Sequence, residues 1–185
     1  MLLPSFNHAR AALVLTMGNL MCGFIALVCI TQERFMEASL LVLLAAVCDS
    51  LDGRVARRGN VASDMGKELD SLCDVVSFGV APALLVYVQF FSQHMSIGAL
   101  LAALFYVGCG AYRLARFNIS HHTDYFVGIP ITLAGIITAL VSWIGSGLPG
   151  GIMIGVLLVL GCLMVSTIKV PKPLQRSVPE EEISL

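Results

Sequence analysis

Long apolar runs separated by short polar stretches organise this chain. Each run approaches the ~20 residues that a helix needs to cross the hydrocarbon core of a bilayer. The runs predict six transmembrane helices, at about 11–30, 36–56, 69–91, 96–116, 127–146 and 151–168. The second and third runs differ from the others because each is polar at one end, where aspartates lie. We therefore expect an all-α polytopic membrane protein with a polar site near one membrane face.

The composition agrees with this interpretation. Hydrophobic residues make up 57% of the 185 residues and charged residues 12%, which is too apolar for a soluble domain of this size. The net charge of -1 gives no reason to expect nucleic-acid binding. The first apolar run lacks a small-residue cleavage site, so we expect a retained helix and no cleaved signal peptide. The six cysteines are scattered without a C-x-x-C pair, which favours apolar packing over zinc or disulfides.

Lysine and arginine predict the direction of the helices. With a cytoplasmic N-terminus, ten of the eleven basic residues fall on the cytoplasmic side, and only Arg34 falls opposite. This asymmetry predicts a multi-pass protein of the cell membrane, with both termini and the aspartates toward the cytoplasm. No internal repeat is visible in the sequence. We expect one transmembrane domain over residues 1–170 and a flexible cytoplasmic tail over 171–185, which is rich in proline and charge.

Four aspartates stand out within the second and third apolar runs: Asp49, Asp52, Asp70 and Asp74. An ionised carboxylate at membrane depth costs roughly 2.5 to 3.5 kcal/mol, so four of them need compensating charge. Spacings of three and four residues place each pair on one helix face. Oxygen ligands without His or Cys favour Mg²⁺ or Mn²⁺. Two such ions would balance the four charges and could stabilise the attacking and leaving oxygens of a displacement at phosphorus.

Residues with little or no side chain lie beside these carboxylates. Gly53 and Ala56 continue the face that carries Asp49, and Gly66 begins the row that continues through the third-run aspartates. Such residues let a bulky ligand approach the backbone, and the guanidinium of Arg57 can bind phosphate through its fork of donors. The alternative is that the aspartates only pair with nearby lysine and arginine in a solvated loop. That alternative does not explain the glycines beside them. We therefore expect a metal-dependent site for a phosphate-containing ligand.

The pattern D-x-x-D-G-x-x-A-R, eight residues, then G-x-x-x-D-x-x-x-D, running from Asp49 to Asp74, resembles the complete signature of the CDP-alcohol phosphotransferases. The resemblance implies a six-helix membrane fold, usually homodimeric. It also implies transfer of a phosphatidyl or related group from a CDP-linked donor to an alcohol, with release of CMP.

The same resemblance implies roles for individual residues. All four aspartates would be ligands of a divalent metal, with two ions expected, and Asp74 would also act as general base. The CDP-lipid would be lined by Gly53, Ala56, Arg57, Gly66 and, as a weaker match, Ser63.

Further stretches point to the acceptor alcohol. The segment G-A-Y-R-L-A-R-F-N at 110–118 and the segment F-x-G-I-P at 126–130 are similar to the phosphatidylserine synthase branch of the family. That branch implies CDP-diacylglycerol and L-serine as substrates. Arg113 and Arg116, three residues apart, could hold a carboxylate. The alternative is that they are positive-inside anchors, and the surrounding R-L-A-R-F-N segment favours the carboxylate. Asn118 could contact the acceptor or end its helix, and Asn19 could contact the CDP-lipid or bond to another helix.

Two other functions compete with this interpretation. An enzyme of the same family could use glycerol 3-phosphate or inositol phosphate, but a phosphate dianion would call for a more basic pocket. An ion-coupled transporter could use the same aspartates, but transporters often show internal repeats and place carboxylates at the bilayer midplane. The sequence does not decide between direct displacement and a covalent phosphatidyl-enzyme, and we expect direct displacement. It leaves open the preferred metal, the dimer surface and whether the lipid donor is diacyl or ether-linked.

Overall fold

Helices form nearly all of the described chain, which confirms the all-helical class. The computed structural model describes residues 3–59, 63–91, 96–119, 125–167 and 169–171. The elements are α1 (Leu3–Thr31), α2 (Phe35–Gly59), α3 (Asp64–Asp74), the π-helix η1 (Val75–Val80), α4 (Ala81–Phe91), α5 (Ile97–Ile119), β1 (Tyr125–Val127), α6 (Ile131–Ile144), α7 (Gly150–Val165) and β2 (Lys169–Pro171). Because α3, η1 and α4 follow one another without a break, the described helices form six rods in the predicted order.

Within the described residues, three helical segments are long and apolar enough to cross a membrane: Arg10–Thr31, Asp64–Phe91 and Ile97–Ile119. The helices α6 and α7 are apolar but shorter. This composition agrees with a membrane protein, and α2 differs because it carries the acidic and basic residues of the signature.

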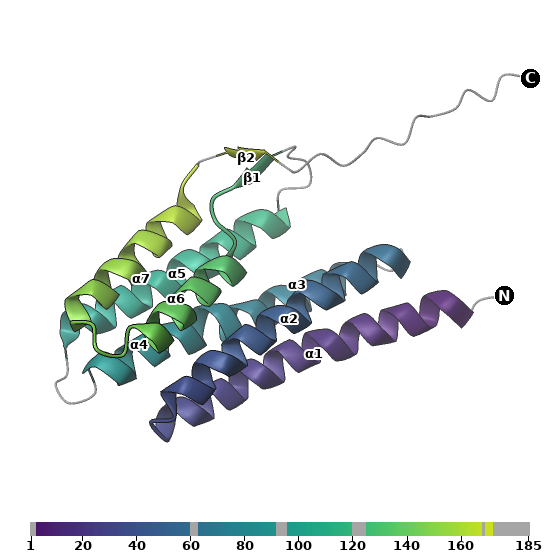
Figure 1. The fold of residues 1–185 in the computed structure, drawn as a ribbon. Coiled ribbons are helices and arrows are strands. Elements are labelled where there is room, and N and C mark those ends of the chain that lie inside the picture. Colours follow the sequence, from purple (N-terminus) through teal and green to yellow (C-terminus); the bar gives the residue numbers. More distant parts are fainter. Residues whose placement is uncertain (1–2, 60–62, 92–95, 120–124, 168, 172–185) are drawn as a thin grey trace, which may run out of the picture.

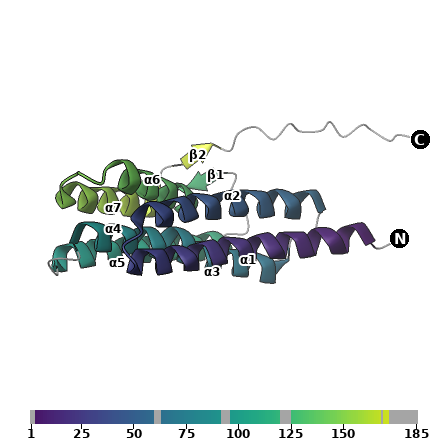
Figure 2. The same ribbon diagram turned by 60° about the horizontal axis from the view of Figure 1, so that its bottom comes forward.

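The rods pack as two layers, which are visible when the bundle is seen from its side (Figure 2). Helices α2, α6 and α7 form one layer, and α1, α5 and the α3–η1–α4 rod form the other. Helix α1 runs along α2 and also contacts α3, η1 and α4, whereas α5 packs mainly on α7. The N-terminal ends of α1 and α3, the C-terminal ends of α2 and α5, and both strands lie at the same end of the bundle (Figure 1). The polar residues of the signature therefore gather at one end.

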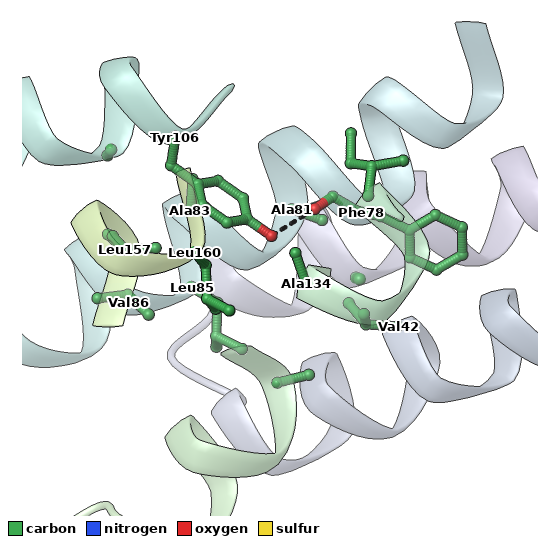
Figure 3. Packing of buried hydrophobic residues seen from close by; sticks show 14 of the residues in the cluster. Val42, Phe78, Ala81, Ala83, Leu85, Val86, Tyr106, Ala134, Leu157 and Leu160 are labelled. Atoms are coloured by element: carbon green, nitrogen blue, oxygen red, sulfur yellow. Dashed lines mark hydrogen bonds between the residues drawn. The ribbon is translucent and has the colours of Figure 1, made fainter. Parts of the chain in front are cut away.

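The π-helix η1 forms the centre of the packing, directly after Asp74. Phe78 in η1 is fully buried, and its carbonyl accepts a hydrogen bond of 3.0 Å from the hydroxyl of Tyr106 on α5 (Figure 3). A Cβ at Gly135 would lie only 2.8 Å from the Cβ of Phe78, so α6 approaches η1 as closely as a glycine allows. Single π-turns within α-helices occur frequently at functional sites. Here the turn fixes the backbone immediately beyond Asp74.

Several predicted boundaries differ from the structure. Helix α1 begins at Leu3, eight residues before the predicted start. Two further differences have a visible local cause. The third rod begins at Asp64, five residues before the predicted start, because the Ser63 side chain caps the helix and accepts a 3.0 Å hydrogen bond from the Gly66 amide. The fifth rod begins at Ile131 because Gly128 adopts a positive φ of 77° and cannot continue a helix.

The short ladder between β1 and β2 is a feature that the apolar pattern did not predict. The two strands pair antiparallel, with Phe126 opposite Val170. Just after β1, a Cβ at Gly128 would lie 2.4 Å from the carbonyl oxygen of Met164, so the chain passes very close to the end of α7. The remainder of the predicted tail, 172–185, lies outside the described residues.

Candidate functional site

Three of the four aspartates converge on one point between α2 and α3. Carboxylate oxygens of Asp49, Asp70 and Asp74 all lie within 4.8 Å of one another. Asp70 and Asp74 are one helical turn apart on α3, so both side chains leave the same face of the helix. Asp49 faces them from α2. This spacing is short enough for three carboxylates to share one cation.

Asp52 lies outside this group of three. It is buried, with 5% of its surface exposed, and its Oδ2 accepts a hydrogen bond of 3.0 Å from the Thr16 hydroxyl of α1. Three residues turn an α-helix by about 300°, which leaves Asp52 about 60° away from the direction of Asp49. The two acids of α2 therefore face different neighbours.

Neutral groups hold the carboxylates. The amide Nδ2 of Asn19 donates to Asp74 Oδ1 at 3.0 Å, and the Thr132 hydroxyl donates to Asp49 Oδ2 at 3.3 Å. Among the described residues, Oδ1 of Asp70 is buried and accepts no hydrogen bond. Amide and hydroxyl donors orient a carboxylate without neutralising its charge. The set of oxygen ligands and the unpaired buried oxygen fit a hard divalent cation.

A cavity of about 520 Å³ opens beside these acids and collects the small residues of the signature. It is lined by Arg10, Ala12, Leu13, Thr16, Asp52, Gly53, Ala56, Arg57, Ser63, Met65, Gly66, Lys67, Leu69 and Asp70. The guanidinium of Arg57 lies across Gly53, since a Cβ there would be 3.5 Å from Nη1. The lining combines charged and polar residues with apolar ones, among them Leu13, Met65 and Leu69. Such a lining suits an amphiphilic molecule with a charged head group.

A second cavity, of about 180 Å³, adjoins the first on the α5 side. It is lined by Lys67, Asp70, Ser71, Asp74, Arg113, Leu114, Phe117, Asn118 and Pro130. Only 8% of Arg113 is exposed, and its Nε has no hydrogen-bond partner among the described residues. Lys67 and Asp70 line both cavities. The arrangement is therefore two compartments that meet beside the aspartates.

The residues predicted for the acceptor have different surroundings. Arg113 and Asn118 line the smaller cavity, and Nδ2 of Asn118 donates to the Ser71 hydroxyl at 3.0 Å. The Nη1 of Arg116 instead donates to the carbonyl of Val165, at the end of α7, at 3.3 Å. Arg116 is absent from the described lining of the smaller cavity. The shared spacing on α5 therefore does not bring both guanidinium groups to one compartment.

Asn19 also differs from its predicted neighbourhood. Its side chain is fully buried and bonds to Asp74, and it does not appear in the described lining of the larger cavity. Its backbone carbonyl accepts a 3.0 Å hydrogen bond from the Ser77 hydroxyl of η1. Of the two possibilities open from the sequence, the observed contacts are those of a bond between helices.

Sequence reasoning did not single out three residues of this site: Thr16, Thr132 and Lys67. Thr16 had a detectable signal, since it lies three residues before Asn19 and makes a polar pair on one face of an apolar helix. Thr132 reaches Asp49 from 83 positions away, and nothing in its local sequence indicates this. Lys67 directly follows Gly66, but the sequence pattern indicated only a positive-inside charge and a possible ion-pair partner of the acids.

Comparison with known proteins places the chain in a family. The family model for CDP-alcohol phosphatidyltransferase matches residues 10–167. A CDP-diacylglycerol–serine O-phosphatidyltransferase of Bacillus subtilis (strain 168) is 39% identical over 159 residues, covering 85% of this chain and 88% of the relative. One of Methanocaldococcus jannaschii is 40% identical over 158 residues, covering 85% and 71%. An archaetidylserine synthase of Methanothermobacter thermautotrophicus is 35% identical over 166 residues, covering 86% and 68%. The chain therefore belongs to the CDP-alcohol phosphatidyltransferase family.

Proposed function

We propose that this protein transfers the phosphatidyl group of CDP-diacylglycerol to the hydroxyl of L-serine, forming phosphatidylserine and CMP. The names of the similar proteins support the reaction. The observation that carries the proposal is that two cavities of unequal size meet at Asp70, within reach of the carboxylate group of three. A transferase that joins a large donor to a small acceptor needs such a pair of compartments.

The larger cavity suits the donor. Gly53 and Arg57 line it and would contact the diphosphate and nucleotide, because a guanidinium binds phosphate oxygens through paired donors. Asp52 lines the same cavity and would hold metal there. Ala56, Gly66 and Ser63 also line this cavity and would lie along the nucleotide. The apolar lining residues Leu13, Met65 and Leu69 would contact the beginning of the acyl chains. The relative named archaetidylserine synthase leaves both diacyl and ether-linked donors open.

The smaller cavity suits a compact acceptor. A volume of about 180 Å³ can hold serine, and the buried guanidinium of Arg113 would pair with its carboxylate. Inositol phosphate is much bulkier, and a phosphate dianion would require more cationic groups than this cavity offers. Asn118 would contribute polar contacts at the same wall. For Arg116 we propose a supporting role at the end of α7, through its bond to Val165.

The chemistry requires one proton transfer and one exchange at phosphorus. Asp74 lines the acceptor cavity, so it would accept the serine hydroxyl proton. The serine oxygen would form a bond to the lipid-linked phosphorus, and the bond from that phosphorus to the bridging oxygen of CMP would break. Bound divalent metal, two Mg²⁺ or Mn²⁺ ions held by the four aspartates, would supply charge stabilisation for the phosphate oxygens. No covalent enzyme intermediate is required.

The membrane arrangement is part of the proposal. Six spans would place the site at the cytoplasmic face of the cell membrane, which agrees with the basic residues at the same end of the bundle as the aspartates. We also propose a homodimer, on the family resemblance alone. The absence of a visible repeat and the presence of the acceptor cavity favour the enzyme over an ion-coupled transporter.

An acceptor panel tests the function. Purified protein would be supplied with CDP-diacylglycerol, Mn²⁺ and, in separate reactions, L-serine, glycerol 3-phosphate or inositol phosphate, and the release of CMP would be measured. We expect release with L-serine only. If CMP is released with glycerol 3-phosphate or inositol phosphate and not with serine, then that compound is the acceptor and the proposal of serine is wrong. Absence of release with all three would contradict the transferase.

A further inference from the structure

We infer that Lys67 binds the phosphoryl group during its transfer, at the boundary between the donor and acceptor cavities. The inference rests on the proposed two-cavity transferase, but not on serine as the acceptor. Lys67 would be an additional cationic residue in the site. The contacts to the CDP-lipid predicted so far involve the aspartates, the glycines and Arg57.

The position of Lys67 is the first argument. Among the described lining residues, only Lys67 and Asp70 belong to both cavities. The attacking oxygen would come from the smaller cavity while the diphosphate occupies the larger one. The phosphorus must therefore lie at the boundary, and a residue that lines both sides is in reach of its oxygens.

The charge of the neighbours is the second argument. The described lining gives Arg57 to the larger cavity only and Arg113 to the smaller cavity only. Asp70, which also lines both cavities, supplies no positive charge to offset the anionic donor diphosphate. Lys67 is the cation that both cavities share, so it would offset phosphate charge at the point where the new bond forms.

The way Lys67 is held is the third argument. Its Nζ lies 3.2 Å from the carbonyl oxygen of Asn118 and 5.3 Å from the ring centroid of Phe117. Both contacts lie at the C-terminal end of α5, where helix carbonyls carry partial negative charge. An ammonium group has three N–H donors, and the carbonyl uses one. The side chain is thereby oriented while further donors remain for phosphate oxygens.

A purely structural role makes a different prediction. If Lys67 only tethers the end of α5, a neutral donor to the Asn118 carbonyl should replace it. Glutamine provides such a donor without charge, arginine retains the charge, and methionine retains only the apolar stem. Lys67→Gln, Lys67→Arg and Lys67→Met therefore separate charge from tethering. Arg54→Met is the matched control, because Arg54 is also exposed and is absent from the described lining of both cavities.

The experiment measures CMP release and, separately, binding of CDP-diacylglycerol in detergent micelles with Mn²⁺ and no acceptor. We expect Lys67→Gln and Lys67→Met to lower kcat/KM for CDP-diacylglycerol by about 10- to 100-fold, less than the loss for a fully enclosed oxyanion donor because Lys67 is exposed. Both should also weaken CDP-diacylglycerol binding several-fold. Lys67→Arg should retain most activity and binding, and Arg54→Met should behave as wild type.

Wild-type activity and binding in Lys67→Gln would overturn the inference, because they would show that Lys67 only holds the end of α5. Unchanged binding and turnover in both neutral variants would overturn it as well. If the wild type releases no CMP with serine, the proposal of serine as acceptor fails. The binding of CDP-diacylglycerol by the Lys67 variants then still tests whether Lys67 contacts the donor. Thermal unfolding of each variant, with Lys67→Gln expected to melt close to wild type, confirms that folded proteins are compared.

Discussion

The side-chain amide of Asn19 donates a 3.0 Å hydrogen bond to Asp74 across the interface between α1 and α3. The backbone carbonyl of Asn19 simultaneously accepts from Ser77, three residues beyond Asp74. One residue of α1 therefore fixes both the proposed general base and the π-helix that follows it. The bond occupies Oδ1 of Asp74 and leaves Oδ2 for a proton or a metal.

Replacement of Asn19 by leucine should impair catalysis more than folding. Loss of the amide donor frees the Asp74 carboxylate to rotate, and loss of such supporting partners typically costs about 10- to 100-fold in activity or metal affinity. We expect kcat to fall by that factor and the half-saturating Mn²⁺ concentration to rise. Steady-state assays with varied Mn²⁺ check this.

The control for this variant is Ser39→Ala. Ser39 is also fully buried but bonds only to the Phe35 carbonyl of its own helix, according to its described contacts. Its kcat and Mn²⁺ dependence should stay at the wild-type level. Wild-type values for Asn19→Leu would show that the bond to Asp74 has no catalytic role.

Replacement of Gly23 by alanine should destabilise the fold. The added Cβ would lie 2.3 Å from the Ser77 hydroxyl and 2.9 Å from its Cα, so α1 must move away from η1. Overpacking of this kind costs about 1–3 kcal/mol. At Gly108 an added Cβ meets no atom within 4 Å, and alanine in a helix gains up to about 1 kcal/mol over glycine. Unfolding in detergent should therefore separate Gly23→Ala from Gly108→Ala, and equal stability of the two would contradict the close α1–η1 contact.

Replacing each of the two arginines of α5 by methionine should change different properties of the protein. Arg113 is buried against the acceptor cavity, so Arg113→Met should raise the KM for serine at least about tenfold, the cost of losing one charge-assisted hydrogen bond. The KM for CDP-diacylglycerol should change little. Arg116→Met removes the bond to Val165 and should lower thermal stability with a smaller effect on serine KM. A larger KM effect from Arg116→Met would move the carboxylate contact to Arg116.

Removal of divalent metal should abolish turnover. The three converging carboxylates offer only oxygen atoms as metal ligands, which suits Mg²⁺ or Mn²⁺. EDTA should therefore stop CMP release, and added Mg²⁺ or Mn²⁺ should restore it. Asp70→Asn should increase the metal concentration required, because it removes charge from the acid whose Oδ1 accepts no hydrogen bond in the described structure. Full activity in EDTA would rule out the metal-dependent reaction.

Helical spacing and the family pattern together predicted part of this arrangement. Asp70 and Asp74 share a face of α3 because they are four residues apart, and the family pattern places both beside Gly66. Spacing does not determine where a long side chain ends. Arg113 and Arg116 leave α5 in similar directions, yet one lines the cavity and the other bonds to α7.

Partners from distant helices were beyond local patterns. The Thr132 bond to Asp49 depends on how α6 packs against α2. The apolar pattern of α6 does not indicate that contact. The β1–β2 ladder was missed for a related reason. Its residues 125–127 and 169–171 flank apolar runs, and pairing between them depends on the tertiary fold.

The most direct measurement compares CMP release by the wild type and Asp74→Asn, with CDP-diacylglycerol, L-serine and Mn²⁺. Asparagine preserves the shape of the side chain but cannot accept the serine proton, so we predict release that depends on serine in the wild type and falls at least about 100-fold in the variant. CDP-diacylglycerol binding should be largely retained. Near-normal turnover of Asp74→Asn, in protein that binds the donor normally, would contradict the account.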